Sequence, residues 1–251
     1  MSMPGMYVTP EQLMADRADF ARKGISRGRS LVVLEYDEGI AMVAQNASST
    51  LRKISEIYDR IAFGGVGRYS EFDTLRIAGV RQAELTGFQY SRHDVEARSL
   101  ANGYAQMLGH TFTHEMKPLE VELVVAELAE PGGRNSIYRI QYDGTVTDQQ
   151  LFCCIGGESD AVLERVEEGY RDALSRDEAI VLAVAALAGP DDELTADELE
   201  VAVLRPSAGD EVLARHCFHR LADDEVAAVV AAAPRSDSSA DDDDDTDEAS
   251  A

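Results

Sequence analysis

Two strand-forming runs around a short turn place the tightest constraint on the fold of this 251-residue chain. Residues 30–46, SLVVLEYDEGIAMVAQN, have aliphatic residues on both sides of Asp37-Glu38-Gly39. A glycine-containing tight turn between two such runs is typical of a β-hairpin. We therefore expect antiparallel sheet near the start of the chain.

A second hairpin is predicted for residues 53–66, KISEIYDRIAFGGV, with its turn near Asp59. Its second arm contains Ala62, Gly64 and Gly65. Such small residues in a strand indicate that other parts of the chain approach closely. We expect this strand to be covered on both faces.

The helical segments come in pairs between blocks of strands. Thr9, Pro10 and Gln12 have the spacing of a capping box, and predict a helix over 10–23 that ends at Gly24. Ser91 and Ser175 are expected to cap two later helices. The other expected helices are 67–86, 91–112, 159–174, 176–188 and 222–233, and the other expected strands are 121–128, 136–142, 151–157, 199–204 and 211–221. This order predicts an α+β fold of layered, mainly antiparallel sheets.

Charge and composition exclude several classes of protein. The net charge is −24, and eight acidic but no basic residues follow from Asp237 onward. We expect a single domain over residues 9–235 and a disordered acidic tail over 236–251. The acidity argues against nucleic-acid binding, which needs clustered lysine and arginine.

The sequence also indicates a soluble cytoplasmic protein. Its start lacks the pattern of a signal peptide, and its longest apolar run, 179–188, is about half of what a membrane span needs. Cys153 and Cys154 are adjacent, which suits free thiols in a reducing compartment. No cofactor or metal site is expected. His110 and His114 lack a third ligand, His216 and His219 fall on opposite faces of a strand, and Gly64-Gly65-x-Gly67 lacks the spacing of a phosphate loop.

Several long segments, in order, resemble the proteasome core α subunit of the actinobacterial type. These are TPEQLMADRADFARKGI, RSLVVLEYDEGI, LRKISEIYDRIAF, LANGYAQMLG and KPLEVELVVAEL, and the resemblance extends from about Tyr7 to Ala233. It implies a four-layer αββα sandwich of the N-terminal-nucleophile hydrolase type. It also implies heptameric rings stacked on catalytic β rings. The Tyr-Asp-Arg gate motif of archaeal and eukaryotic α subunits is absent near the N-terminus, and Tyr58-Asp59-Arg60 is a hairpin turn.

Active members of this fold use an N-terminal threonine, an acidic residue and a lysine. Counting from the hairpin glycine Gly39, Arg29 occupies the nucleophile position and Gln45 the acidic position, whereas Lys53 matches the lysine. Arginine has no hydroxyl and stays protonated, so it cannot act as the nucleophile. The chain is therefore expected to be non-catalytic. The alternative is an N-terminal-nucleophile hydrolase with Ser30 exposed by processing, and a third possibility is a stand-alone binding domain.

The resemblance implies two contact sites. Residues 1–8 correspond to a segment that closes the axial pore, which makes Met3, Pro4, Met6, Tyr7 and Val8 candidate gate residues. Lys53 corresponds to a lysine between neighbouring α subunits that receives the C-terminal tail of an AAA-type ring ATPase. The implied partners are the β subunit, neighbouring α subunits, that ATPase, and substrates tagged with a prokaryotic ubiquitin-like protein. Helix 10–23, with Arg17, Arg22 and Lys23, is expected to supply α–α contacts.

Overall fold

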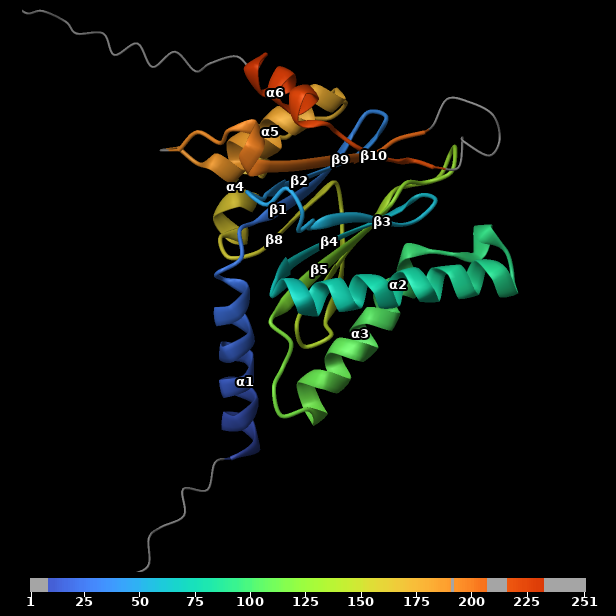
Figure 1. The fold of residues 1–251 in the computed structure, drawn as a ribbon, viewed down its shortest axis with the longest axis vertical. Helices are drawn as coiled ribbons and strands as arrows, with labels where there is room; N and C mark the ends of the chain where they lie inside the picture. Colours follow the sequence, from blue (N-terminus) through green and yellow to red (C-terminus); the bar gives the residue numbers. More distant parts are fainter. Residues whose placement is uncertain (1–8, 191, 207–215, 233–251) are drawn as a thin grey trace, which may run out of the picture.

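The fold consists of two five-stranded antiparallel sheets packed face to face. The computed structural model describes residues 9–190, 192–206 and 216–232, so the predicted gate segment and acidic tail lie outside the described residues. The first sheet has the strand order β10-β9-β2-β1-β8 and the second has β3-β4-β5-β6-β7. Helices α4, α5 and α6 cover the first sheet, whereas α2 and α3 cover the second (Figure 1). The predicted four-layer αββα sandwich is confirmed.

The helices and strands alternate in blocks along the chain. The helices are α1 (Pro10–Ile25), α2 (Tyr69–Gln89), α3 (Ala97–His114), α4 (Ser159–Gly169), α5 (Arg176–Ala188) and α6 (Asp223–Ala231). The strands of the first sheet are β1 (Leu31–Tyr36), β2 (Gly39–Gln45), β8 (Phe152–Ile155), β9 (Leu199–Leu204) and β10 (Phe218–Arg220). Those of the second sheet are β3 (Ile54–Tyr58), β4 (Ile61–Gly67), β5 (Val121–Glu127), β6 (Ser136–Ile140) and β7 (Val146–Gln149).

Both predicted hairpins are present, and their registers define the two sheets. In the first hairpin Tyr36 pairs with Gly39 across the turn. In the second, Tyr58 pairs with Ile61, after a bulge that follows Glu56. One strand was missed: β7, whose residues are only partly buried and give a weak apolar alternation. The strand predicted at 211–221 is confirmed only for Phe218–Arg220, and residues 211–215 lie outside the described part of the chain.

Strand β4 is covered on both faces, as its small residues indicated. A Cβ atom at Gly64 would lie 2.8 Å from Cγ1 of Val124 and 2.9 Å from Cδ1 of Leu31, between the two sheets. A Cβ atom at Gly65 would lie 2.8 Å from Cγ of Phe72, on the helix-covered face. The absence of side chains at these two positions therefore sets the separation of three of the four layers.

Several predictions of helix boundaries were wrong, among them the end of α4, which was predicted at 174 and lies at Gly169. Ser91 does not begin the long helix: its side chain accepts a hydrogen bond from the His93 amide and caps a short 3-10 turn at Arg92–Asp94. Helix α3 starts at Ala97, because the Glu127 carboxylate of β5 accepts from the Ala97 amide at 2.9 Å. Helix α1 continues past Gly24 to Ile25, and Ser26 is its C-cap residue. A tertiary contact thus decided the start of α3.

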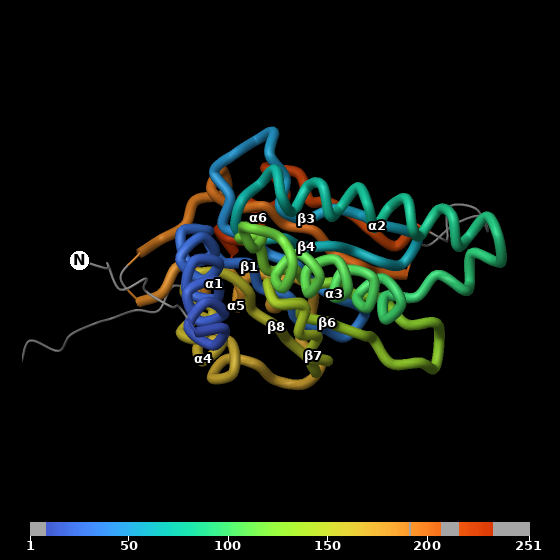
Figure 2. The backbone as a smooth tube through the Cα atoms, turned by 90° about the horizontal axis from the view of Figure 1, so that it is seen from below, coloured from blue at the N-terminus to red at the C-terminus, as the bar shows by residue number. Residues whose placement is uncertain are grey.

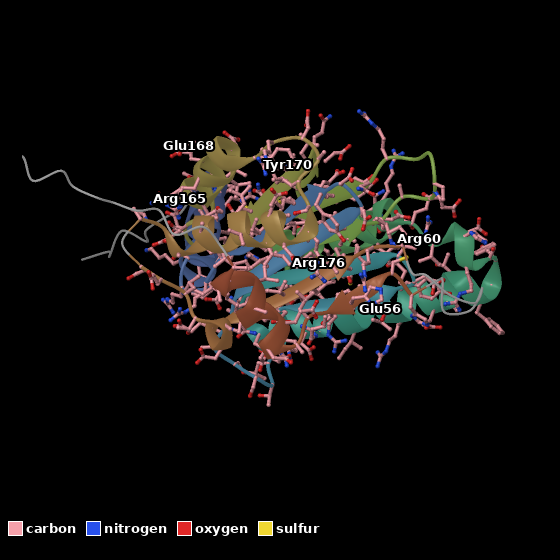
Figure 3. The ribbon with its side chains drawn as sticks, turned by 90° about the horizontal axis from the view of Figure 1, so that it is seen from above. Glu56, Arg60, Arg165, Glu168, Tyr170 and Arg176 are labelled. Atoms are coloured by element: carbon pink, nitrogen blue, oxygen red, sulfur yellow. The ribbon has the colours of Figure 1, made fainter. Side chains whose placement is uncertain are left out.

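Polar contacts join the helices of the outer layer above the first sheet. Arg165 on α4 donates from Nε to the Ala186 carbonyl of α5 at 2.7 Å. Arg176 at the start of α5 forms an ion pair with Glu225 of α6 at 2.8 Å. Both arginines are labelled on these helices in Figure 3. Helix α1 lies at one end of the sandwich (Figures 1 and 2), where it packs against the last turn of α3.

The surroundings of Gly64, on β4, and of Gly103, on α3, predict opposite effects on stability when each is replaced by alanine. Gly64→Ala adds a methyl group where both neighbours are already too close, and we expect a loss of about 1–3 kcal/mol of unfolding free energy. In Gly103→Ala, on α3, the new methyl meets the side-chain amide of Gln82, which can move. That variant is expected to be neutral or to gain about 0.5–1 kcal/mol from helix propensity. Urea denaturation of each full chain measures the difference; equal stability of the two variants would contradict the close sheet contact at Gly64.

Candidate functional site

Lys53 lies immediately before β3, at the end of the sandwich where α1 joins β1. Its backbone is held on both sides, because its amide donates to the Glu200 carboxylate at 2.8 Å and its carbonyl accepts from the Gly65 amide at 3.0 Å. Its ammonium Nζ donates to the Arg29 carbonyl at 2.7 Å and to the Gln45 carbonyl at 3.0 Å. The side chain thus bridges the start of β1 and the end of β2.

The structure brings together the three positions that sequence counting singled out. Arg29 and Gln45 both lie at the open end of the first hairpin, where the Gln45 amide donates to the Ser30 carbonyl at 3.2 Å. It is their backbone carbonyls, rather than their side chains, that contact Lys53. A hydroxyl nucleophile needs a neighbouring base, and these contacts occupy the lysine with neutral backbone groups instead. That Arg29 and Gln45 stand at the nucleophile and acidic positions remains a prediction.

Ser30, the candidate nucleophile of the alternative hypothesis, is placed poorly for that role. Its residue is only 6% exposed. A Cβ atom at Gly156 would lie 3.2 Å from its Oγ, so the hydroxyl is covered closely by the end of β8. Within the described ranges, no lysine, histidine or carboxylate side chain forms a hydrogen bond with this hydroxyl. The geometry therefore offers no base that would activate Ser30.

The environment of Lys53 makes its amine easier to deprotonate than an ordinary lysine. Burial, which disfavours the charged form, lowers the pKa of Lys53 to about 8. The Glu200 carboxylate opposes this change, and the Arg29 guanidinium adds to it. The amine is therefore mainly an ammonium at neutral pH and mainly neutral above pH 8.

An ammonium has three N–H donors, and the structure shows partners for two of them. Among the described residues, the third N–H of Lys53 has no acceptor. A cavity of about 190 Å³ adjoins the same end of the hairpin; its lining includes Arg27, Arg29, Gln45 and Glu158 but not Lys53 itself. One N–H donor of Lys53 is therefore left unused by the described residues.

The predicted contact residues of helix α1 are partly used within the chain. Arg17 donates to the carbonyls of Thr111 and Glu115, and so caps the last turn of α3. Arg22 pairs with Asp19 at 3.3 Å and lies over the Tyr142 ring. Of the three basic residues expected to reach a neighbouring subunit, Arg17 is thus directed at its own chain.

The other sequence candidates do not form a ligand site. The rings of His110 and His114 stack with centroids 4.7 Å apart, while His216 contacts Glu56 at 3.2 Å. In the described part of the chain no three potential ligands gather into a metal-binding group. Burial raises the pKa of the Cys153 thiol to about 12, which leaves it unreactive. None of the described helices combines the length and apolar character that crossing a bilayer requires.

Sequence reasoning missed the carboxylate that organises this site. Glu200 lies in the middle of LEVAVL, every residue of which is buried, and it is itself 2% exposed. Its partners Asn46 and Arg220 are 154 and 20 residues away in sequence. The one signal was a charged residue inside an otherwise apolar strand, because such a residue requires polar partners.

The fold and the site together define a class of protein. Two antiparallel sheets packed face to face between helix layers, with a lysine at the open end of the first hairpin, form a sandwich of the N-terminal-nucleophile hydrolase type. The chain belongs to the proteasome subunit family, because the family model described as "Proteasome subunit" matches residues 25–204.

Relatives named "Proteasome subunit alpha" match most of the chain. The one from Acidimicrobium ferrooxidans is 54% identical over 226 residues, covering 90% of this chain and 95% of the relative. The one from Xylanimonas cellulosilytica is 52% identical, covering 88% and 93%. The one from Streptosporangium roseum is 55% identical, covering 81% and 79%.

The environment of Lys53 predicts an unusual titration. Reaction with acetic anhydride at a series of pH values, read by mass spectrometry, should give a midpoint near pH 8 for Lys53. Lys117 is the control. Burial lowers its pKa, but hydrogen bonds to Glu120 and Glu71 outweigh that effect and leave it raised. A midpoint for Lys53 at or above that of Lys117 would show that its amine is not buried as described.

Proposed function

We propose that this chain is a non-catalytic α-type ring subunit of a bacterial proteasome core. In this role it controls the entry of substrates into the β-ring chamber and binds the C-terminal tails of a ring ATPase. The relatives named as α subunits support the type of subunit. The observation that carries the docking role is the Lys53 ammonium, held by two backbone carbonyls with one donor left over.

A non-catalytic role agrees with the chemistry at the end of the first hairpin. The Lys53 ammonium contacts backbone carbonyls rather than a hydroxyl and a carboxylate, and the Ser30 hydroxyl has no activating base within the described residues. The subunit would then contribute to proteolysis through assembly. We propose that it acts in the cytoplasm, on proteins tagged with a prokaryotic ubiquitin-like protein.

Exposed apolar side chains support assembly with neighbouring subunits. Near the end of α2, Phe88 is 89% exposed and Tyr90 is 76% exposed. On α1, Leu13 and Phe20 are also exposed. Large apolar side chains clustered on a surface mark contacts between proteins. We propose that α1 contacts a neighbouring α subunit and that the end of α2 contacts another subunit of the particle.

The chemistry of Lys53 suits the terminal carboxylate of a peptide. A partly desolvated ammonium forms a charge-assisted hydrogen bond with a carboxylate, which contributes about 1.5–3 kcal/mol. A single contact of this size binds weakly. Several tails of one ring ATPase would bind together, because linked sites raise the effective concentration of each tail.

The same lysine links the proposed docking site to the connection that follows α1. Its bond to the Arg29 carbonyl holds the connection between α1 and β1. Residues 1–8 precede α1, so a change in this connection would reach them through the helix. We propose that a bound tail biases α1, and with it the gate residues Met3, Pro4, Met6, Tyr7 and Val8, toward an open arrangement.

Replacing Lys53 should separate docking from assembly. In a core assembled with the β subunit, Lys53→Ala is expected to abolish ATPase-stimulated protein degradation, because the tail carboxylate loses its partner. Arg52→Ala is the matched control, since it removes the adjacent cation and should leave stimulation in place. Sizing of each core verifies assembly. Stimulation of the Lys53→Ala core at the control level would rule out docking at this residue.

Deleting residues 2–8 tests the gate. The assembled core should then hydrolyse small peptides faster without any ATPase, because the pore is no longer closed. The intact core, assayed at equal concentration, is the reference. No increase in peptide hydrolysis by the truncated core would mean that these residues do not close the pore.

A further inference from the structure

Glu200 is the buried charge on which the geometry around Lys53 depends. It lies on β9 of the first sheet, whereas Ile54 begins β3 of the second sheet and Lys53 immediately precedes it. Its Oε2 accepts from the Lys53 amide at 2.8 Å and from the Asn46 side-chain amide at 2.8 Å. Its Oε1 accepts from the Ile54 amide at 3.2 Å and from the Arg220 guanidinium. A carboxylate has about four acceptor sites, so all of them are used.

The partners of Glu200 close a ring around the segment between β2 and β3. Asn46 donates from the same side-chain nitrogen to the Leu51 carbonyl at 2.8 Å, across the base of this segment. Arg220, on β10, donates from its second nitrogen to the Ile54 carbonyl at 2.6 Å. Together these bonds fix where the backbone of Lys53 leaves the first sheet and enters the second.

Glu200 also supplies the charge opposite the Lys53 ammonium. The charged groups that act on Lys53 are Glu200 from β9 and Arg29 from the segment before β1. Arg220 from β10 pairs with Glu200, and β2 contributes the uncharged Gln45. The attraction of Glu200 opposes the desolvation of the amine and the repulsion from Arg29. Both the position of Lys53 and the charge that faces its ammonium therefore depend on the carboxylate of Glu200.

We propose that Glu200 is the positioning residue of the docking site: through its four hydrogen bonds it fixes Lys53 where the two sheets meet, and it provides the counter-charge of the lysine. This inference rests on the proposed docking function, since it explains how the docking lysine is held. Glu200 itself is buried and does not touch the incoming tail.

Two substitutions of Glu200 separate its charge from its contribution to folding. Glu200→Gln removes the charge and places an amide where donors converge. Glu200→Asp keeps the charge but shortens the side chain. Both are expected to lower the urea midpoint of unfolding. Only Glu200→Gln should move the acetic anhydride midpoint of Lys53 downward, by about one pH unit, which is the size expected for loss of a nearby opposite charge.

Arg220→Gln should shift the acetic anhydride midpoint of Lys53 in the opposite direction. This variant tests the proposal if Glu200→Gln does not fold. Without the guanidinium, the negative charge of Glu200 is no longer shared with a cation. The Lys53 midpoint should therefore move upward. Arg205→Gln is the control: it removes a cation at the end of β9 that has no contact with Glu200, and it should leave the midpoint in place.

The functional readout is the pH profile of ATPase-stimulated degradation by assembled cores. The stimulation should fall as the pH passes the Lys53 midpoint, near 8 for the native core and lower for Glu200→Gln. Peptide hydrolysis by a core lacking residues 2–8 at each pH corrects for the pH dependence of the β subunit. A purely structural role would lower stability in both Glu200 variants alike and leave the Lys53 midpoint unmoved, and that result would overturn the inference.

The labelling experiment also distinguishes failure of this inference from failure of the proposed function. If the Lys53 midpoint shifts in Glu200→Gln while stimulation of the native core does not depend on Lys53, the positioning role stands and docking at Lys53 is wrong. If stimulation depends on Lys53 but the midpoint is unaffected by Glu200, docking stands and the positioning role is wrong.

Discussion

The hydrogen bonds of the buried Glu200 carboxylate are the interaction on which the geometry around Lys53 depends. Removing a carboxylate from water costs several kcal/mol unless every acceptor site is filled. Here the compensation comes from four donors on three separate parts of the chain: Asn46 after β2, the amides that open β3, and Arg220 on β10. A charge that requires all of these partners keeps both sheets in one relative position, and it keeps Lys53 beside Arg29 and Gln45.

The same lysine could serve two kinds of chemistry within one scaffold. A lysine next to an N-terminal hydroxyl and a carboxylate would assist a nucleophile. In this chain its ammonium instead holds two backbone carbonyls and retains one donor. While it is protonated, that remaining donor suits the binding of an anion, which is the basis of the proposed docking role. The scaffold thus places a charge at the end of the sandwich, and the residues around it decide between catalysis and recognition.

Much of the fold could be predicted because local patterns and tertiary packing agree. The hairpin turn at Asp37-Glu38-Gly39, the capping box of Ser175 with Glu178 and the small residues of β4 all appear in the structure as expected. The prediction failed where a distant contact overrides a local signal, as when Glu127 moved the start of α3 to Ala97. It also failed for β7, where half-buried residues left little apolar alternation.

The functional site was predictable only in part for the same reason. Counting from Gly39 selected Arg29 and Gln45, which flank the paired strands β1 and β2, whereas Lys53 came from the family resemblance; the roles of all three remain predictions. It could not identify Glu200 or Arg220, because the contacts of Glu200 with Lys53 and of Arg220 with Ile54 form only when β9 and β10 pack beside β3. Side-chain convergence across two sheets has no periodic signature along the chain.

The most direct test of the docking role is a cryo-electron microscopy structure of the assembled core with its ring ATPase bound. The terminal carboxylate of an ATPase tail should lie within hydrogen-bonding distance of Lys53 Nζ, while the Lys53 amide remains bonded to Glu200. A tail carboxylate seated elsewhere, with Lys53 still bonded only to the carbonyls of Arg29 and Gln45, would contradict it.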